Sequence, residues 1–228
     1  MPVTTVIFDA YGTLFDVAAA ARQAAQEPAF PALKTRWVDV ATHWRAKQLQ
    51  YSWLLAVTRN HIDFWQVTQN GLDWALEATG LDGDAALRQR LLDLYWELQA
   101  YAEVPTMLAE LKKAGLNTAI LSNGSPAMLD AAVKSAGLGD VLDAVLSVES
   151  VGIFKPDYRV YDLVGERFDC TETEVLFVSS NGWDAAAASG YGFVTAWANR
   201  ANEPVDRLPW TPTHVVSDLT SIPALATG

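Results

Sequence analysis

Six short apolar runs limit how this chain can fold. They are rich in Val, Ile, Leu and Phe and lie at residues 3–8, 118–121, 144–148, 175–178, 193–197 and 214–217. Continuous apolar runs of this length are typical of parallel strands buried on both faces. After residue 100, helix-length stretches separate them, for example 106–114 and 127–136. This alternation predicts an α/β fold, a Rossmann-like core of three layers (α/β/α) with a parallel sheet.

The first two predicted strands are separated by a long segment of different character. Residues 17–100 are rich in Ala, Leu, Gln and Trp. Apolar residues recur there at helical spacing, for example at Trp37, Val40, Ala41, Trp44, Leu49, Trp53 and Val57. The sequence GLDGD at 80–84 breaks the segment into at least two helical blocks. We therefore expect a helical cap at 17–100, inserted into a core formed by 1–16 and 101–228.

The charge balance excludes some classes of partner. The 228 residues include 16 basic and 27 acidic side chains, which give a formal net charge of −11. Such a chain is a poor match for nucleic acid or for an anionic membrane surface. If the substrate is a small anion, a few local cations must attract it.

The chain carries no sequence signal for a membrane or for export. No apolar run approaches the roughly 20 residues of a membrane span, and the start MPVTTVIFD lacks the pattern of a signal peptide. The single cysteine, Cys170, has no partner for an internal disulfide and is interpreted as an inert residue before a strand. We expect a cytoplasmic protein.

Polar side chains directly follow several of the predicted strands. The segments VIFDAYGTLFD, AILSNGSP, FKPDYRVY and FVSSNGWDAA carry, in chain order, Asp9 and Thr13, Ser122 and Asn123, Lys155, and Ser179, Asn181 and Asp184. The carboxyl ends of parallel strands meet at one edge of a sheet, where α/β proteins bind ligands. The four segments therefore predict one site, in which Asp9 is the first candidate for covalent chemistry.

Two absences in these segments narrow the chemistry. A magnesium-dependent phosphatase with this kind of loop would carry a second Asp two residues after Asp9, where this chain has Tyr11. The fourth segment, SSNGWD, offers a single acid and not a pair of acids that could hold a metal ion. A halide is a weak base that leaves without a proton, and a monoanionic haloacid needs no metal to screen it. Both absences are compatible with cleavage of a carbon–halogen bond.

The four ordered segments, together with WRAKQLQYSWL at 44–54, resemble the haloacid dehalogenase superfamily, and within it the (S)-2-haloacid dehalogenases. The resemblance extends from residue 6 to about residue 200. It implies hydrolysis of small (S)-2-haloalkanoic acids to (R)-2-hydroxyalkanoic acids and halide. It also implies a homodimer that needs neither a cofactor nor a metal.

The resemblance assigns the covalent chemistry to Asp9. Asp9 would attack the α-carbon, expel halide and form an ester, whose carboxyl carbon water then attacks. Lys155 would neutralise and orient Asp9, with Thr13 in the same catalytic group and Tyr161 supporting Lys155. From residue type alone, Lys155 before Pro156 could instead be a surface residue that starts a helix.

A second group would serve the hydrolytic step. The resemblance implies that Asp184, with Asn181, holds and polarises the water. Ser179 is expected to contact Lys155 or Asp9. Ser180, Asn181 and Asp184 are also suited to cap the start of a helix, and the two interpretations are compatible.

A third group of residues would bind the substrate's carboxylate and the halide that leaves it. Ser122 and the backbone amides that start the next helix would bind the carboxylate. Asn123 and Arg45 would hold the departing halide, although spacing alone would make Arg45 a solvated helix residue. The family often has Gln directly after this arginine, and this chain has Ala46, a change that we expect to widen the pocket or alter the acyl-chain preference.

An apolar pocket would exclude water from the reaction. The resemblance assigns it to Tyr11, Leu49, Phe64 and Trp183, with Ala10 also at the substrate. A dry surrounding strengthens the attraction between a carboxylate and an ammonium group.

Two other functions remain open from the residues. One is a phosphatase of the same superfamily, and the other is a small-anion sensor that keeps the fold without turnover. The three histidines, His43, His61 and His214, match no metal-binding spacing and receive no role.

Overall fold

A computed structural model describes residues 2–228 and contains a six-stranded parallel sheet. The strands are β1 (Thr5–Phe8), β2 (Asn117–Ser122), β3 (Ala144–Ser147), β4 (Val175–Ser179), β5 (Val194–Ala198) and β6 (His214–Val216). Their order is β3-β2-β1-β4-β5-β6, and every neighbouring pair is parallel. The first strand therefore lies inside the sheet, between β2 and β4, and its carboxyl end opens onto the centre of the sheet edge.

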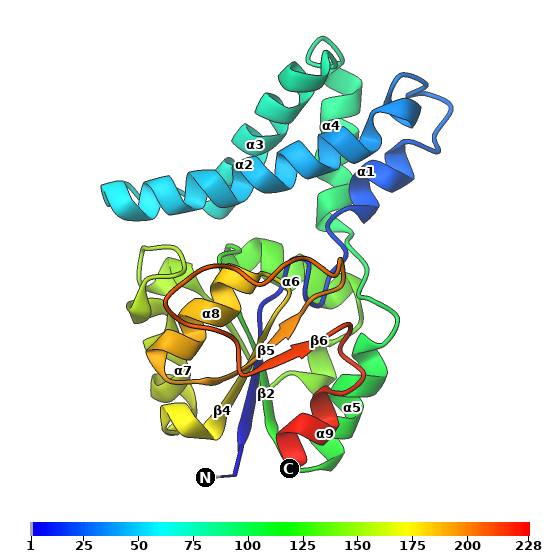
Figure 1. Cartoon of the computed structure of the whole chain (residues 1–228). Helices are drawn as coiled ribbons and strands as arrows, with labels where there is room; N and C mark the ends of the chain where they lie inside the picture. The colour runs from blue at the N-terminus through cyan, green and yellow to red at the C-terminus, as the bar shows by residue number, and fades with distance from the viewer. Residues whose placement is uncertain (1) are drawn as a thin grey trace.

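Helices pack on both faces of this sheet. They are α5 (Val104–Lys113), α6 (Pro126–Ser135), α7 (Tyr158–Phe168), α8 (Gly182–Tyr191) and α9 (Ile222–Thr227). Figure 1 shows α7 and α8 on one side of the sheet and α5 and α9 on the other. The predicted α/β fold with three layers is thereby confirmed.

Four further helices form a separate layer, which we call the cap. They are α1 (Ala19–Ala24), α2 (Trp37–Thr58), α3 (Phe64–Thr79) and α4 (Ala85–Trp96), and they lie between β1 and β2 in the sequence. Figure 1 shows them above the carboxyl-terminal edge of the sheet. The predicted break at 80–84 is confirmed, since α3 ends at Thr79 and α4 begins at Ala85.

Short 3₁₀ turns complete the chain. They are η1 (Leu33–Thr35), η2 (Gly139–Val141), η3 (Val148–Ser150) and η4 (Glu172–Glu174). The six predicted strands agree with the observed ones to within one or two residues, and the first strand begins at Thr5 instead of residue 3. Within residues 2–228, no helix combines the length and the apolarity needed to cross a membrane.

The apolar periodicity of α2 only partly marks its buried face. The buried positions are Val40, Trp44, Gln48 and Ser52, which follow one another at i, i+4 spacing. Val57 is 82% exposed, because the apolar residues near the end of α2 lie on a neighbouring face of the helix. The buried stripe therefore contains polar side chains that hydrophobicity does not identify.

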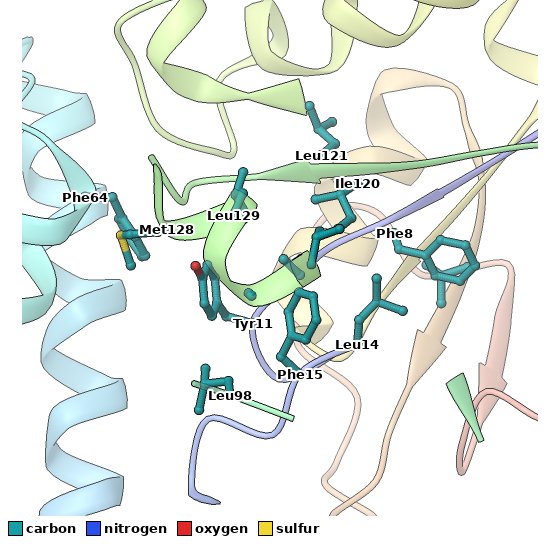
Figure 2. Close-up of a cluster of buried hydrophobic side chains, with 14 of the residues drawn as sticks. Phe8, Tyr11, Leu14, Phe15, Phe64, Leu98, Ile120, Leu121, Met128 and Leu129 are labelled. Atoms are coloured by element: carbon teal, nitrogen blue, oxygen red, sulfur yellow. The ribbon is translucent and has the colours of Figure 1, made fainter. Parts of the chain in front are cut away.

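Buried apolar side chains pack between the sheet edge and the cap. Figure 2 shows Tyr11, at the end of β1, close to Leu129 of α6 and on the side of the cap residue Phe64. Tyr11 is 3% exposed and Phe64 is 2% exposed. This packing surrounds the carboxyl end of β1 with apolar groups.

Candidate active site

Asp9 follows the last residue of β1 and is held by three side chains from other parts of the chain. Its Oδ1 accepts a hydrogen bond from Lys155 Nζ at 3.2 Å. Its Oδ2 accepts from Thr13 Oγ1 at 3.1 Å and from Asn181 Nδ2 at 2.9 Å. The residue is only 6% exposed. The carboxylate is therefore ionically paired and fixed in orientation, as a nucleophile requires.

Lys155 joins Asp9 to a second carboxylate. The residue is 1% exposed, and its Nζ also donates to Asp184 Oδ2 at 2.9 Å. Burial lowers the pKa of Lys155, but the charges of Asp184 and Asp9 outweigh burial and raise the pKa above its ordinary value. The ammonium group thus stays protonated and bridges the two carboxylates.

Asp184 is the more deeply buried of the two acids, at 1% exposure. Burial raises its pKa, and the nearby Asp9 acts in the same direction, while Lys155 and Tyr161 oppose the rise. The Tyr161 hydroxyl donates to Asp184 Oδ1 at 2.8 Å. A raised pKa makes this carboxylate a better proton acceptor. The hydroxyl of Tyr161 thus supports Lys155 only indirectly, through Asp184.

Asn181 precedes α8 but does not cap it with its side chain. Its amide nitrogen donates to Asp9, and its Oδ1 accepts from Arg45 Nη2 at 3.1 Å. The side chain therefore links the nucleophile to the cap.

Ser179 lies at the end of β4, and its hydroxyl does not bond either of the expected partners. Its Oγ accepts from the backbone N–H of Asn181 at 3.1 Å, and no hydrogen bond to Lys155 or Asp9 occurs among the described residues. Ser179 shapes the turn into α8, because a serine hydroxyl readily bonds the backbone two residues on.

Ser180 was predicted only to help start a helix and was given no part in the site. Its backbone N–H donates to Thr13 Oγ1 at 2.8 Å, and Thr13 Oγ1 lies 3.1 Å from both Asp9 Oδ2 and Ser180 Oγ. A Cβ on Gly12 would lie 3.0 Å from Ser180 Oγ, and Gly12 has a φ of +89°. Both conditions favour glycine in this loop. The only sequence signal was the second serine of SSNGWD.

The residues expected at the anion lie after β2. Ser122 is buried and its Oγ accepts from Gly124 N–H at 3.1 Å. Asn123 is 7% exposed, and its Oδ1 accepts from the Lys155 backbone N–H at 3.0 Å. The amide of Asn123 is thereby oriented with its nitrogen away from Lys155, and α6 begins directly after this turn at Pro126.

Arg45 extends from α2 of the cap to the core. Its Nη2 donates to the backbone oxygen of Tyr11 at 2.9 Å and to Asn181. Its Nη1 donates to Gln48 Oε1 at 2.9 Å. Arg45 and Asn123 each reach this region, but no hydrogen bond joins them in the described chain.

The remaining predicted residues form the apolar surroundings. The Tyr11 ring lies 6.3 Å from that of Phe64, and burial raises the pKa of Tyr11 well above its ordinary value, which keeps it neutral. Trp183 contacts Trp53 of the cap edge to face, with 5.3 Å between ring centroids. Ala10 is fully buried in the turn after β1.

A cavity of about 400 Å³ lies beside this group. Its walls include Arg45, Leu49, Asn181 and Trp183, which the sequence placed in the site, together with Arg200. Ala46 does not line this cavity. It is exposed and lines a separate hollow on the cap. Ala46 therefore makes no direct contact with this cavity through which it could change the pocket.

The donor set at Asp9 is suited to ion pairing. Both Asp9 and Asp184 direct an oxygen at the same ammonium group, and Tyr11 occupies the position of a second acid. Within residues 2–228 no cluster of three or more His, Cys, Asp or Glu side chains could hold a metal ion.

Comparison with known proteins agrees with this geometry. A family model described as a haloacid dehalogenase-like hydrolase matches residues 3–192. An (S)-2-haloacid dehalogenase of Pseudomonas sp. (strain YL) is 42% identical over 217 residues, which are 95% of this chain and 91% of that protein. An (S)-2-haloacid dehalogenase of Xanthobacter autotrophicus is 44% identical over 88% of this chain and 77% of that protein.

A solved structure of the same class is similar along the whole chain. The L-2-haloacid dehalogenase from Xanthobacter autotrophicus with chloropropionic acid covalently bound has a TM-score of 0.85 and 37% identity. The alignment covers 99% of each chain.

Proposed function

Because this chain belongs to the haloacid dehalogenase-like hydrolases, and within them to the (S)-2-haloacid dehalogenases, we propose that it hydrolyses small (S)-2-haloalkanoic acids to (R)-2-hydroxyalkanoic acids and halide. One observation carries the proposal: the buried Lys155 Nζ bridges the two buried carboxylates of Asp9 and Asp184. A nucleophile and a base are thereby held in place by one buried cation. A protein that only binds anions needs no such pair.

In the first step, an oxygen of Asp9 attacks the α-carbon of the substrate from the side opposite the halogen. A carbon–oxygen bond forms, the carbon–halogen bond breaks, and halide leaves with the electron pair. Backside attack inverts the α-carbon, so that an (S) substrate gives an (R) product. Lys155, Thr13 and Asn181 orient the carboxylate for this attack.

In the second step, water attacks the carboxyl carbon of the Asp9 ester. Asp184 takes a proton from the water, and its raised pKa suits it to that role. The bond between the carboxyl carbon and the ester oxygen then breaks, and the product alkoxide takes the proton that Asp184 had accepted. The proton left on the Asp9 carboxyl group passes to solvent. Asp9 is regenerated and carries one oxygen from the water.

We propose that the substrate's carboxylate and its departing halide are held by separate groups in the site. Ser122 and the amides at the start of α6 bind the carboxylate, since a helix N-terminus favours negative charge. Arg45 and Asn123 hold the departing halide. Tyr11, Leu49, Phe64 and Trp183 exclude bulk water and line the space for the alkyl group.

This chemistry requires neither a metal nor a cofactor. Halide leaves as a stable anion, and the charge of a single carboxylate is within reach of the local cations. The negative net charge makes nucleic acid and anionic membranes unsuitable partners.

We also propose an arrangement for the whole enzyme. Residues 17–100 act as a cap over the core of 1–16 and 101–228. The exposed apolar residues Trp53, Leu54 and Val57 of α2 support a homodimer through the cap, which light scattering would detect as a mass of twice 24.8 kDa. The free Cys170 suits a reducing compartment such as the cytoplasm, and fractionation of the host cell would test this.

The experiment is halide release from racemic 2-chloropropionate in the presence of EDTA. Wild type should consume only the (S) substrate and yield (R)-lactate, and Asp9→Asn should release no halide. If wild type were inactive on this substrate and on bromo- and fluoroacetate, but released phosphate from phosphate esters with magnesium, the chain would be a phosphatase. Anion binding without any turnover would instead indicate a sensor.

A further inference from the structure

Gln48 is a buried polar side chain at the point where three cap helices meet. It belongs to α2 and is 1% exposed. Its Oε1 accepts from Arg45 Nη1 at 2.9 Å. Its Nε2 donates to Thr68 Oγ1 of α3 at 2.8 Å and to Tyr95 OH of α4 at 3.0 Å. A buried amide with both ends engaged is stabilising, because an unpaired one would cost free energy.

The surrounding bonds fix which end of the amide faces Arg45. The Thr68 hydroxyl donates its single proton to the Phe64 backbone oxygen at 2.8 Å. It can therefore only accept a hydrogen bond from Gln48. The amide nitrogen must face Thr68, and the oxygen is left for Arg45, whose guanidinium carries donors alone.

The backbone around Thr68 is anchored as well. The Trp44 indole Nε1 donates to the Thr68 backbone oxygen at 2.8 Å, which ties α3 to α2 one turn before Gln48. The Tyr95 ring stacks on Tyr11 of the core, with 5.6 Å between centroids. Burial raises the pKa of Tyr95, so that its hydroxyl stays neutral. Apart from Arg45, the groups bonded to Gln48 are therefore neutral.

The guanidinium group of Arg45 is consequently held at both of its terminal nitrogens. Gln48 fixes Nη1 from the cap, and the Tyr11 backbone oxygen and Asn181 hold Nη2 from the core. These three acceptors are all neutral groups. A carboxylate in the place of Gln48 would pair with the guanidinium and weaken its attraction for an anion.

We propose that Gln48 is the positioning residue for Arg45. It orients the guanidinium toward the departing halide while leaving the positive charge uncancelled. The proposal rests on the proposed function, because it assigns Gln48 a part in carbon–halogen cleavage. Gln48 touches no reacting atom and acts through Arg45.

The test compares Gln48→Met with wild type on 2-chloropropionate and 2-bromopropionate. Losing a hydrogen bond to a charged group should lower kcat on the chloro substrate by about 10- to 100-fold. Bromide is the better leaving group and depends less on Arg45, so the loss on the bromo substrate should be smaller. A merely structural defect would lower both rates by the same factor.

A double-mutant cycle separates action through Arg45 from an independent effect. In an Arg45→Lys background, the further change Gln48→Met should cost less than about 2-fold in kcat, because coupled residues are not additive. Multiplicative losses would overturn the proposal even if wild type is an active dehalogenase. An inactive wild type would overturn the proposed function and this role with it.

Two variants guard against a folding defect. Ser52→Ala removes a buried hydroxyl of α2 that bonds only to the Leu49 backbone oxygen, and it should leave both rates unchanged. Thr68→Val keeps the shape of α3 but removes the acceptor for Gln48 Nε2. It should show the same preferential loss on the chloro substrate, to a smaller extent, and a lower melting temperature, because one hydrogen of the buried Gln48 amide loses its acceptor. Equal losses on both substrates would contradict the proposal.

Discussion

At the scale of single residues, Lys155 pairs with both acids, and their other neighbours make the two acids different. Its ammonium group contacts both, but Asp184 is the more buried and also receives the Tyr161 hydroxyl. Asp9 Oδ2 accepts hydrogen bonds from Thr13 and from Asn181, and Asn181 in turn contacts Arg45 of the cap. Two carboxylates around one cation thus acquire different tasks from their surroundings.

Removing the base should separate the two chemical steps. Asp184→Asn keeps an acceptor for Lys155 and Tyr161 but takes up no proton, so kcat should fall by about 10²- to 10⁴-fold. Halide should still be released once per active site, and intact-mass measurement should find the ester adduct on Asp9. The Asp9→Asn, Asp184→Asn double variant is the control and should stay unmodified. An unmodified single variant that still lost activity would argue against an ester intermediate.

Tyr161 should influence the pH dependence of the reaction. Its hydrogen bond lowers the pKa of Asp184, which burial raises. Tyr161→Phe should therefore raise that pKa further, and because Asp184 must be ionised to act as a base, activity should be lost at a higher pH on the acid side. The measurement is the pH profile of kcat.

A matched variant shows whether this shift is specific. Tyr191→Phe removes a hydroxyl that bonds Asp162 at 2.7 Å, away from Asp184. Its acid limb should coincide with that of wild type. If Tyr161→Phe left the limb in place as well, Asp184 would not be the group that titrates.

At the scale of elements, the turns after β1, β2 and β4 hold the site together. Strands β2 and β4 flank β1 in the sheet, so Ser122, Asp9 and Ser179 end neighbouring strands. The turn from β2 into α6 passes so close to Tyr11 that it needs a residue without a side chain. A Cβ on Gly124 would lie 2.8 Å from the Tyr11 ring and 3.1 Å from Leu129.

Gly124→Ala should therefore damage both stability and the pocket. The Tyr11 ring is buried and stacked, so it can yield only by disturbing its neighbours, and the free energy of unfolding should fall by about 1–3 kcal/mol. Activity should fall too, because Tyr11 lines the proposed pocket. Denaturant unfolding and halide release are the measurements. Gly139→Ala, where nothing lies within 4 Å, is the control, and a harmless Gly124→Ala would contradict this packing.

At the scale of the whole molecule, cap and core touch through a few side chains around the site. Arg45 reaches the Tyr11 backbone, and Trp53 meets Trp183. On the connection between α2 and α3, His61 Nε2 lies 2.9 Å from Glu149 Oε2 of η3. We expect the cap to open at this interface for substrate entry.

His61→Ala should weaken closure more than it weakens the fold. The pair is partly exposed, so its loss should change the free energy of unfolding by less than about 1 kcal/mol. KM should rise, because the closed form that holds substrate becomes less populated. Steady-state kinetics and denaturant unfolding measure the two effects. His43→Ala removes a ring that contacts Trp74 within the cap and should leave KM unchanged. The same KM for both variants would exclude a role of His61 in closure.

Much of the fold was readable from the sequence because its signals are local. Continuous apolar runs marked the strands, and GLDGD marked the break between α3 and α4. The strand-end residues Asp9, Lys155 and Asp184 could be expected to meet, since parallel strands end at a common edge. Their roles came from the resemblance to a family, and these roles stay predictions for the experiments above.

The sequence by itself determined the sheet, the inserted helices and the candidate reactive side chains, because period, length and residue type are properties of neighbouring positions. Only the tertiary structure decided which side chains share a proton or a charge. It turned Ser179 to its own backbone, placed Tyr161 on Asp184, and put Gln48 behind Arg45. Such partners come from separate elements, and burial makes each of them satisfy a donor or an acceptor that no local pattern specifies.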